Sequence, residues 1–288
     1  MTPEPDPDFA AACRLRWPGF RATGSLPARK SQLLVGELDG VRVVAKRLAR
    51  PNAVWAWYLA RELAIYRAFA ATPPPFRAPR LVAATDDILV VEHVSGEPLA
   101  RRRRPAAELT PDQLAALLAT CAQIAAWSGT WPEGPVAPPA VHRALRRRLL
   151  EDATAPVAWV REGVARGAAT GILDDAQAAA IDGALALEVA PSHGDLLLRH
   201  AIGDGDAITL VDWECAGPHL ALWDRALLWT QLGDDAREQL ERRVGAGELR
   251  ALVALAAFAL VREIAIVRAF NASDDALVRA LTATVARL

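Results

Sequence analysis

The spacing of apolar residues changes near residue 95, and this change constrains the fold more than any other feature of the chain. Before it, apolar and polar residues alternate over residues 32–38, 41–48, 80–85 and 88–94, as they do in half-buried strands. Asp39-Gly40, between the first two segments, is typical of a hairpin turn. The first part of the chain is therefore predicted to form a small sheet, interrupted by one helix.

Helical signals dominate after this point. Thr110-Pro111-Asp112 is a typical helix start, because a threonine cap precedes a proline in the first turn. Long alanine- and leucine-rich segments follow at 112–127, 142–165, 174–189 and 247–270. The sequence therefore predicts an α+β protein with two lobes. We expect residues 1–94 to form a β-rich lobe, 95–105 a linker and 106–288 a larger, mostly helical lobe.

Composition and charge restrict the class of partner. The 288 residues carry 33 basic and 34 acidic side chains, so no global field recruits nucleic acid or an anionic membrane. The start, MTPEPDPDF, is acidic and proline-rich, unlike a signal peptide, and we expect it to be a loose leader. The apolar run at 251–261 is too short to span a bilayer. Three widely spaced cysteines favour neither a disulfide framework nor a zinc site, so a cytoplasmic protein is expected.

A lysine and a glutamate in the first lobe are predicted to pair. Trp55, Tyr66 and Phe69 recur at helical spacing, and Glu62 lies on the same stripe. A buried carboxylate needs a cation, and Lys46, one of only two lysines in the chain, lies on an apolar strand face. The alternative remains open at this point: Lys46 as an edge-strand cation and Glu62 as a surface acid.

A second group of charged residues surrounds the segment SHGDLLLRH at 192–200. The stretch GDGD at 203–206 is predicted to be the turn of a hairpin that brings His200 next to Asp212, while Asp195 precedes the hairpin. Two carboxylates beside an imidazole can hold a divalent cation and orient a hydroxyl nucleophile. The alternative is that Asp195 is a turn residue, Asp212 a helix cap, and His193 and His200 core histidines.

The order of these pieces resembles the protein-kinase-like fold, and within it the aminoglycoside phosphotransferase family of small-molecule kinases. The family's catalytic loop reads His-Gly-Asp, followed by an asparagine five residues after the aspartate; this chain has HGDLLLRH, with His200 at that place. LVDWECAGPHLALWDRALL at 210–228 is similar to the family's second conserved segment. The resemblance covers about residue 20 to about residue 270. It implies a bilobal fold with a nucleotide-binding first lobe.

The resemblance also implies roles for the charged residues. Asp195 would accept the proton of the acceptor hydroxyl or orient it, and Asp212 would bind magnesium. Asp224 would take a structural position. Lys46 would hold the α- and β-phosphates while Glu62 positions it. For His200 three roles stay open: a metal ligand, a hydrogen-bond donor to a phosphate or to metal-bound water, or a bystander.

Nucleotide contacts are expected from two further segments. The loop at 24–32 offers its backbone N–H groups and side chains to the β- and γ-phosphates. The side chains are those of Ser25, Arg29, Lys30 and Ser31. Adenine is expected to bond to the backbone of Glu92 and Val94. The run Arg101 to Arg104 is interpreted as a solvated face, with contact to substrate or nucleotide as the alternative.

The function implied is an ATP-dependent O-phosphotransferase that uses Mg²⁺, with Mn²⁺ as an alternative. Its acceptor would be a hydroxyl of a small molecule such as an antibiotic or another secondary metabolite, and the protein would be a monomer or a homodimer. Two alternatives remain. One is a pseudokinase, a nucleotide-binding regulatory module with impaired transfer, which the change to His200 favours. The other is a kinase of a primary metabolite.

Overall fold

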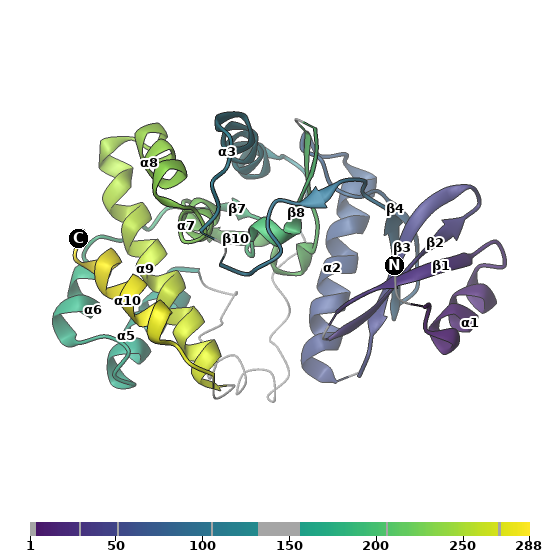
Figure 1. Cartoon of the computed structure of the whole chain (residues 1–288), viewed down its shortest axis with the longest axis horizontal. Coiled ribbons are helices and arrows are strands. Elements are labelled where there is room, and N and C mark those ends of the chain that lie inside the picture. The colour runs from purple at the N-terminus through teal and green to yellow at the C-terminus, as the bar shows by residue number, and fades with distance from the viewer. Residues whose placement is uncertain are drawn as a thin grey trace.

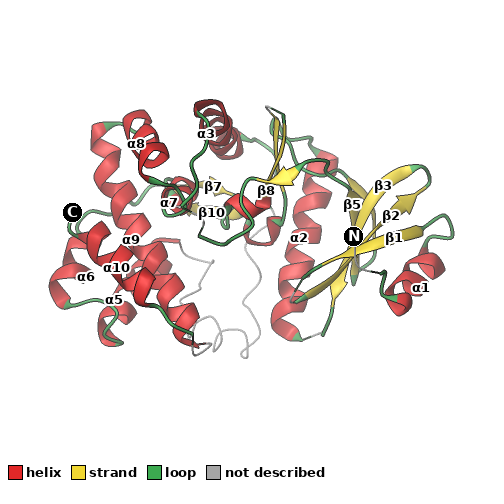
Figure 2. Cartoon of the chain, in the orientation of Figure 1, coloured by secondary structure: helices red, strands yellow, loops and turns green. Residues whose placement is uncertain are grey.

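A computed structural model describes residues 4–28, 30–50, 52–104, 106–131, 156–205, 207–269 and 272–288. A twisted sheet lies at one end of an elongated molecule and a group of helices at the other, with α2 (Ala53–Ala71) beside the sheet (Figure 1). Colouring by secondary structure separates the two ends clearly (Figure 2). This arrangement confirms the predicted α+β fold with a β-rich first part and a mostly helical second part.

The sheet is antiparallel and has the strand order β1-β2-β3-β5-β4. Its strands are β1 (Arg21–Leu26), β2 (Ser31–Leu38), β3 (Val41–Leu48), β4 (Leu81–Ala84) and β5 (Ile88–Glu92). The predicted hairpin between β2 and β3 is confirmed, with Asp39 and Gly40 both at positive φ, 51° and 81°. A two-residue turn of this kind matches the twist of the strands that it joins.

Two expectations about the first part of the chain are wrong. The expected loose leader contains α1 (Pro7–Arg16), which Asp6 caps by accepting the Phe9 N–H at 2.8 Å. Phe9 and Cys13 are buried in the smaller hydrophobic core, against the sheet, and this burial offsets the entropy of ordering the segment. The loop expected at 24–32 is shorter, because Ser25 belongs to β1 and Ser31 opens β2.

Helix α2 joins the larger hydrophobic core. Asn52 caps it by accepting the backbone N–H groups of Val54 and Trp55. Phe69, near its C-terminal end, packs edge-on against Trp127 and Trp213, which lie far along the sequence. The helix that carries Glu62 is therefore packed on the second part of the chain.

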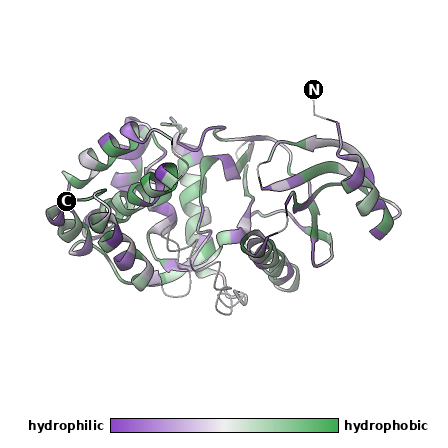
Figure 3. Ribbon diagram, turned by 90° about the horizontal axis from the view of Figure 1, so that it is seen from below, coloured by the Kyte–Doolittle hydropathy of each residue, from purple (hydrophilic) through white to green (hydrophobic). Residues whose placement is uncertain are grey.

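The remaining helices belong to the second part of the chain. They are α3 (Pro111–Ala126), α5 (Pro156–Ala169), α6 (Asp175–Asp182), α7 (Trp223–Trp229), α8 (Asp234–Arg243), α9 (Ala246–Ala269) and α10 (Asp275–Val285). Most helices carry both hydrophobic and hydrophilic stretches, as expected when one face is buried (Figure 3). The long middle of α9 is buried on all sides. No helix among the described residues is long and apolar enough to cross a membrane.

Sequence and structure differ over one helix. The predictions for 112–127 and 247–270 match α3 and α9 to within one residue, whereas the predicted helix at 174–189 ends at Asp182. The chain then extends into β7 (Val189–Ser192), which pairs with β10 (Gly217–Leu220). Residues 142–155 of another predicted helix lie outside the described residues, and α5 covers its end.

One short three-stranded sheet holds the segment that precedes Asp212. The predicted hairpin is confirmed as β8 (Ala201–Asp204) and β9 (Ala207–Leu210), and β8 also pairs with β6 (Glu97–Pro98). Single turns of 3-10 helix flank the hairpin, η1 (Leu198–His200) before it and η2 (Trp213–Cys215) after it. Cys13, Cys121 and Cys215 are not joined by disulfide bonds.

Candidate active site

Lys46 lies at the centre of a group of buried carboxylates. Its Nζ is 2.7 Å from Glu62 Oε2, 2.8 Å from Asp212 Oδ1 and 3.9 Å from Glu214 Oε2. Burial opposes the charge of Lys46, but the carboxylates outweigh it and raise the pKa of the lysine well above its usual value. The predicted pairing of Lys46 with Glu62 is confirmed, and the surface alternative is wrong because Glu62 is buried.

Asp212 connects the lysine to the histidine. It follows β9 and has a left-handed backbone conformation, φ 65°, which aspartate tolerates better than most residues. One carboxylate oxygen meets Lys46, and the other is 3.5 Å from His200 Nε2. Burial acts to raise the pKa of Asp212, but Lys46, His200 and Lys30 together hold it well below its usual range. Asp212 is therefore ionised at neutral pH.

Glu214 is a member of this group that the sequence interpretation did not assign to the site. It lies on η2, two residues after Asp212, and forms an ion pair with Lys30. Burial and the neighbouring Asp212 raise the pKa of Glu214 to about 7. The signal was present in the similarity of LVDWE to the family segment, but only its aspartate received a role.

Three carboxylates form an oxygen-rich group. Oxygens of Glu62, Asp212 and Glu214 lie within 4.8 Å of one another. Carboxylate oxygen is the ligand that Mg²⁺ prefers, so the donor set fits this metal. Lys46 pairs with all three members of the group, most closely with Glu62 and Asp212, and Lys30 also pairs with Glu214.

The loop before Asp195 is fixed by a buried aspartate. Asp224, in the first turn of α7, accepts the backbone N–H groups of His193 at 2.6 Å and Gly194 at 3.0 Å. Gly194 has φ 81°, and a Cβ there would collide with the Cys215 carbonyl oxygen. Its own carbonyl accepts the Trp223 indole N–H at 2.9 Å. These contacts determine the direction in which the Asp195 side chain leaves the loop.

The Asp195 carboxylate has one oxygen near His200 and one buried oxygen without a hydrogen-bond partner. Oδ2 lies 3.7 Å from His200 Nδ1, whereas the buried Oδ1 has no partner within the described part of the chain. Burial opposes ionisation, but Arg103, His200 and Arg262 outweigh it, so the pKa of Asp195 is lowered. An ionised carboxylate with an unpaired oxygen is suited to accept a hydrogen bond from a hydroxyl group.

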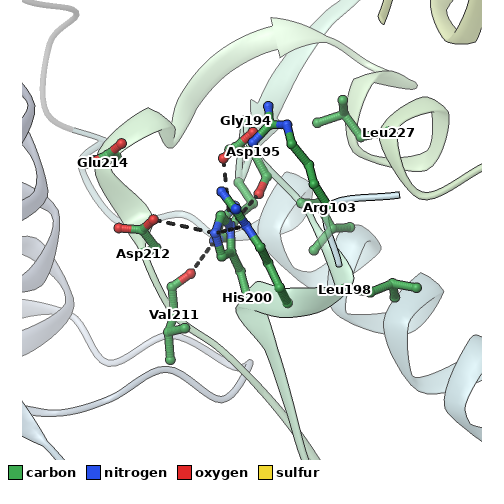
Figure 4. A network of polar contacts seen from close by, with 12 residues as sticks. Arg103, Gly194, Asp195, Leu198, His200, Val211, Asp212, Glu214 and Leu227 are labelled. Atoms are coloured by element: carbon green, nitrogen blue, oxygen red, sulfur yellow. Dashed lines mark hydrogen bonds and ion pairs between the residues drawn. The ribbon is translucent and has the colours of Figure 1, made fainter. Parts of the chain in front are cut away.

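His200 lies between Asp195 and Asp212 (Figure 4). Its Nδ1 is 3.0 Å from the Asp195 carbonyl oxygen, and its Nε2 accepts from Arg199 Nε at 3.1 Å. These two contacts fix the orientation of the imidazole ring. The structure therefore brings together the three residues of the predicted catalytic segment, with one imidazole in contact with both carboxylates.

The predicted phosphate-binding residues are dispersed. The Ser25 hydroxyl donates to the Glu4 carbonyl at 3.0 Å, and Lys30 reaches Glu214 while lying over the rings of Trp55 and Tyr58. The Ser31 hydroxyl, in contrast, is buried and has no hydrogen-bond partner among the described residues. Arg29 lies outside the described residues.

The residues expected to meet adenine lie where the chain leaves the sheet. Glu92 ends β5, and its N–H donates to the Arg80 carbonyl at 2.9 Å, so a base would use its carbonyl oxygen instead. Val94 follows two residues later. No contact in the structure tests this prediction.

The arginine run divides into two parts. Arg101 is 83% exposed and pairs only with Glu97, as a solvated face predicts. Arg103 and Arg104 instead turn inward to Glu263 on α9, and the Arg103 side chain lies close to Asp195 (Figure 4). The solvated-face interpretation is therefore wrong for these two residues.

Comparison with known proteins identifies the family. A model described as the phosphotransferase enzyme family matches residues 28–260. The chain belongs to this family. Membership of the phosphotransferase enzyme family confirms the predicted enzyme class, a small-molecule kinase, and the predicted resemblance. A search of the curated proteins found no significant match.

Solved structures of family members share the fold. The apoenzyme of macrolide 2'-phosphotransferase MphH from Brachybacterium faecium is 16% identical, with a TM-score of 0.63 over 96% of this chain and 97% of that one. A thermostable mutant of aminoglycoside phosphotransferase APH(4)-Ia, in complex with ADP and hygromycin B, is 15% identical with a TM-score of 0.63, and the coverage is again 96% and 97%. An APH(2") enzyme with GDP and kanamycin is 14% identical, with a TM-score of 0.65 over 98% of each chain.

Proposed function

We propose that this phosphotransferase moves the γ-phosphate of ATP to a hydroxyl group of a small molecule. The observation that carries the proposal is the contact of His200 with both Asp195 and Asp212. Through this contact the Asp195 carboxylate, which suits a hydroxyl group, lies near the carboxylates around Asp212, which suit a divalent cation. Phosphoryl transfer needs this proximity, because positioning and charge neutralisation do most of the work.

In the proposed reaction the acceptor oxygen forms a bond to the γ-phosphorus as the bond between this phosphorus and the β,γ-bridging oxygen breaks. ADP leaves, and the hydroxyl proton passes to Asp195 or to solvent. Asp195 orients the hydroxyl through its unpaired oxygen. Lys46 exchanges one of its carboxylate partners for nucleotide phosphate oxygens while Glu62 keeps its position. Lys30, Ser31, Ser25 and Arg29 supply the phosphate-binding loop, and Glu92 and Val94 meet the base.

Mg²⁺ would be held by Asp212, with Glu214 beside it, because these oxygens fit a hard cation. When bound, the ion neutralises charge on the nucleotide oxygens. His200 serves as a hydrogen-bond donor to a phosphate or to metal-bound water in our preferred assignment. That role requires Nε2 to give up its contact with Arg199 in the structure. Mn²⁺ is the alternative metal if His200 is a direct ligand.

Family relatives guide the choice of acceptor and nucleotide. Those compared above are named for macrolides and aminoglycosides, and two were crystallised with ADP or GDP. We propose that this chain uses ATP as the phosphate donor and a hydroxylated antibiotic or other secondary metabolite as the acceptor. We further propose a cytoplasmic monomer or homodimer, with a nucleotide-binding lobe at 1–94, a linker at 95–105 and an acceptor-binding lobe at 106–288.

A nucleotide-binding regulatory module is the second candidate. It is favoured by His200, which stands where the family has asparagine and whose Nε2 is engaged by Arg199. A kinase of a primary metabolite would use the same groups as the proposed enzyme. Acceptor contacts come from variable helices and loops, so only direct assay separates antibiotic from primary-metabolite acceptors.

The test is transfer of labelled γ-phosphate from ATP to a panel of hydroxylated antibiotics and metabolites. Asp195→Asn is expected to lower turnover about a hundredfold or more, because it removes the orienting carboxylate, while nucleotide affinity changes little. Asp204→Asn, at an exposed position in the nearby hairpin, is the matched control. Nucleotide binding without transfer to any acceptor would establish the regulatory module instead.

A further inference from the structure

Three arginines and a glutamate gather beside Asp195. Glu263 on α9 is buried, with 5% of its surface exposed. Arg103 Nε lies 2.6 Å from one of its carboxylate oxygens, and Arg104 Nη2 lies 3.8 Å from the other. Arg262 precedes Glu263 on the same helix and is close enough to act on the pKa of Asp195. The group therefore joins the 95–104 segment to α9 near the proposed catalytic carboxylate.

The positive charge of this group exceeds the negative charge. Arg103 and Arg104 share the carboxylate of Glu263, and Asp195 is the second carboxylate beside the three guanidinium groups. Nε and Nη1 of Arg104 are buried without a hydrogen-bond partner in the parts of the chain that the structure describes. Burial lowers the pKa of Arg104 to about 10, so the guanidinium still carries its charge at neutral pH. Buried donors of a charged group without partners are costly and rare.

The surplus charge lies beside Asp195, the carboxylate proposed to orient the acceptor hydroxyl. Arg103 heads the groups that lower the pKa of Asp195, ahead of His200 and Arg262. Its side chain is 31% exposed, so a ligand can reach it. The phosphate-binding lysines, in contrast, pair with the carboxylates around Asp212. An anion bound at Arg103 would thus belong to the acceptor and not to the nucleotide.

We propose that the acceptor is a hydroxylated molecule with a carboxylate or phosphate group, which Arg103 and Arg104 bind while the hydroxyl lies at Asp195. This inference rests on the proposed function and narrows its substrate class. Guanidinium groups match carboxylate and phosphate oxygens with paired hydrogen bonds. A polycationic aminoglycoside would meet like charge here, and like-charge contact opposes binding.

A purely structural tie between the linker and α9 is the competing explanation. A tie needs one guanidinium for one carboxylate, and Arg103 with Glu263 already provides it. Arg104 adds a second, longer ion pair to that tie, while its buried Nε and Nη1 have no hydrogen-bond partner among the described residues. The two explanations therefore differ in what Arg104 does, and this residue is the one to change.

The experiment compares matched acids and neutral molecules at constant ionic strength. Glucuronate is paired with glucose, glycerate with glycerol, and glycerol 3-phosphate is added to separate phosphate from carboxylate. Transfer of γ-phosphate from ATP and the rise in melting temperature on binding are both measured, with kanamycin as the cationic probe. We expect the acids to be phosphorylated with a lower KM than their neutral partners, and to raise the melting temperature where the neutral partners do not. Preference for glucose, glycerol or kanamycin would overturn the inference.

Variants of the arginine run decide the origin of any preference. Arg104→Met is expected to raise the KM and the dissociation constant of the preferred acid about tenfold to a hundredfold, the loss of one charge-assisted hydrogen bond, with little change in the KM for ATP. Arg104→Lys keeps the charge and should retain part of the affinity. Arg101→Met, an exposed arginine of the same segment, is the control and should match the parent.

The two proposals fail separately in this design. If no compound is phosphorylated but an acid still raises the melting temperature, and Arg104→Met abolishes that rise, the transferase proposal is wrong and the anion site stands. If transfer occurs but Arg104→Met binds acids as the parent does, the anion site is wrong and the transferase proposal stands.

Discussion

Replacing Lys46 by methionine tests the network that holds the site together. The lysine Nζ pairs with Glu62 at 2.7 Å and with Asp212 at 2.8 Å, and methionine keeps most of the apolar stem while removing the charge. Glu62 is 3% exposed, so the variant leaves a buried carboxylate without its cation. Breaking a buried pair in this way typically costs about 3 to 5 kcal/mol.

Features of the site place the expected loss at the lower end of this range. Asp212 retains 25% exposure of its side chain and can be solvated, and Lys30 still exerts some attraction on Glu62. We therefore expect the free energy of unfolding to fall by about 3 kcal/mol, a large share of the roughly 5 to 15 kcal/mol that a folded protein has. The double variant Lys46→Met, Glu62→Leu should recover most of this loss, because the buried charge of Glu62 is then removed together with its partner, and Asp212 remains partly exposed.

The loss should also depend on pH. Burial raises the pKa of Glu62 in the parent, and removal of Lys46 raises it further. A carboxyl group whose pKa is higher in the folded chain holds its proton more tightly there than in the unfolded chain. The variant is therefore least impaired below about pH 4.3, the unfolded value of glutamate, and loses stability relative to the parent as the pH rises above it.

Urea denaturation at pH 5 and pH 8, followed by tryptophan fluorescence, measures both effects. Arg242→Met removes an exposed cation paired with Glu238 and serves as the control, with an expected change below about 1 kcal/mol. A loss as small as that of the control, or a double variant no more stable than the single one, would refute the account of Lys46 and Glu62.

Three further predictions concern residues around this network. His200→Asn should keep or raise transfer with Mg²⁺, whereas His200→Ala should weaken transfer more than ATP binding. If the parent prefers Mn²⁺ and the Asn variant loses this preference, His200 is instead a direct ligand of the metal. Burial lowers the pKa of His219 to about 4, so the folded chain resists protonation of this residue and stability falls as the pH drops from about 6.5 to 4. Urea titrations should show a smaller fall for His219→Gln. Equal falls in the parent and the variant would show that His219 does not cause the pH dependence. Asp224→Ala should lower the free energy of unfolding by about 2 to 3 kcal/mol in urea denaturation and remove most of the transfer activity, because two backbone N–H groups of the loop before Asp195 lose their acceptor. A stable, active variant would show that the loop is held by other contacts.

The sequence predicted the elements whose signals are local. The hairpin at Asp39-Gly40 and the helix after Thr110 have turn and capping chemistry that depends on neighbouring residues alone. The pairing of Lys46 with Glu62 was also accessible, because a charge on an apolar stripe implies a partner. The same reasoning joined Asp195, His200 and Asp212 through the predicted hairpin.

The remainder depends on tertiary contacts that no local pattern carries. The helix predicted over 174–189 ends early because β7 pairs with β10, nearly 30 residues along the chain. α1 forms because the sheet buries Phe9 and Cys13. Arg103 and Arg104 looked like part of a solvated run, and only the position of Glu263 on α9 distinguishes them from Arg101.

The packing of α2 has a mechanical consequence. Glu62 belongs to this helix, and the helix is fastened to the second part of the chain by aromatic contacts of Phe69 and by the hydrogen bond from Arg61 to the Ala216 carbonyl. Lys46, in contrast, moves with the strands of the five-stranded sheet. Any rigid-body rotation of that sheet against the rest of the molecule must stretch or shorten the Lys46–Glu62 ion pair. The distance between Lys46 Nζ and Glu62 Oε2 would therefore report the position of the sheet relative to the rest of the molecule.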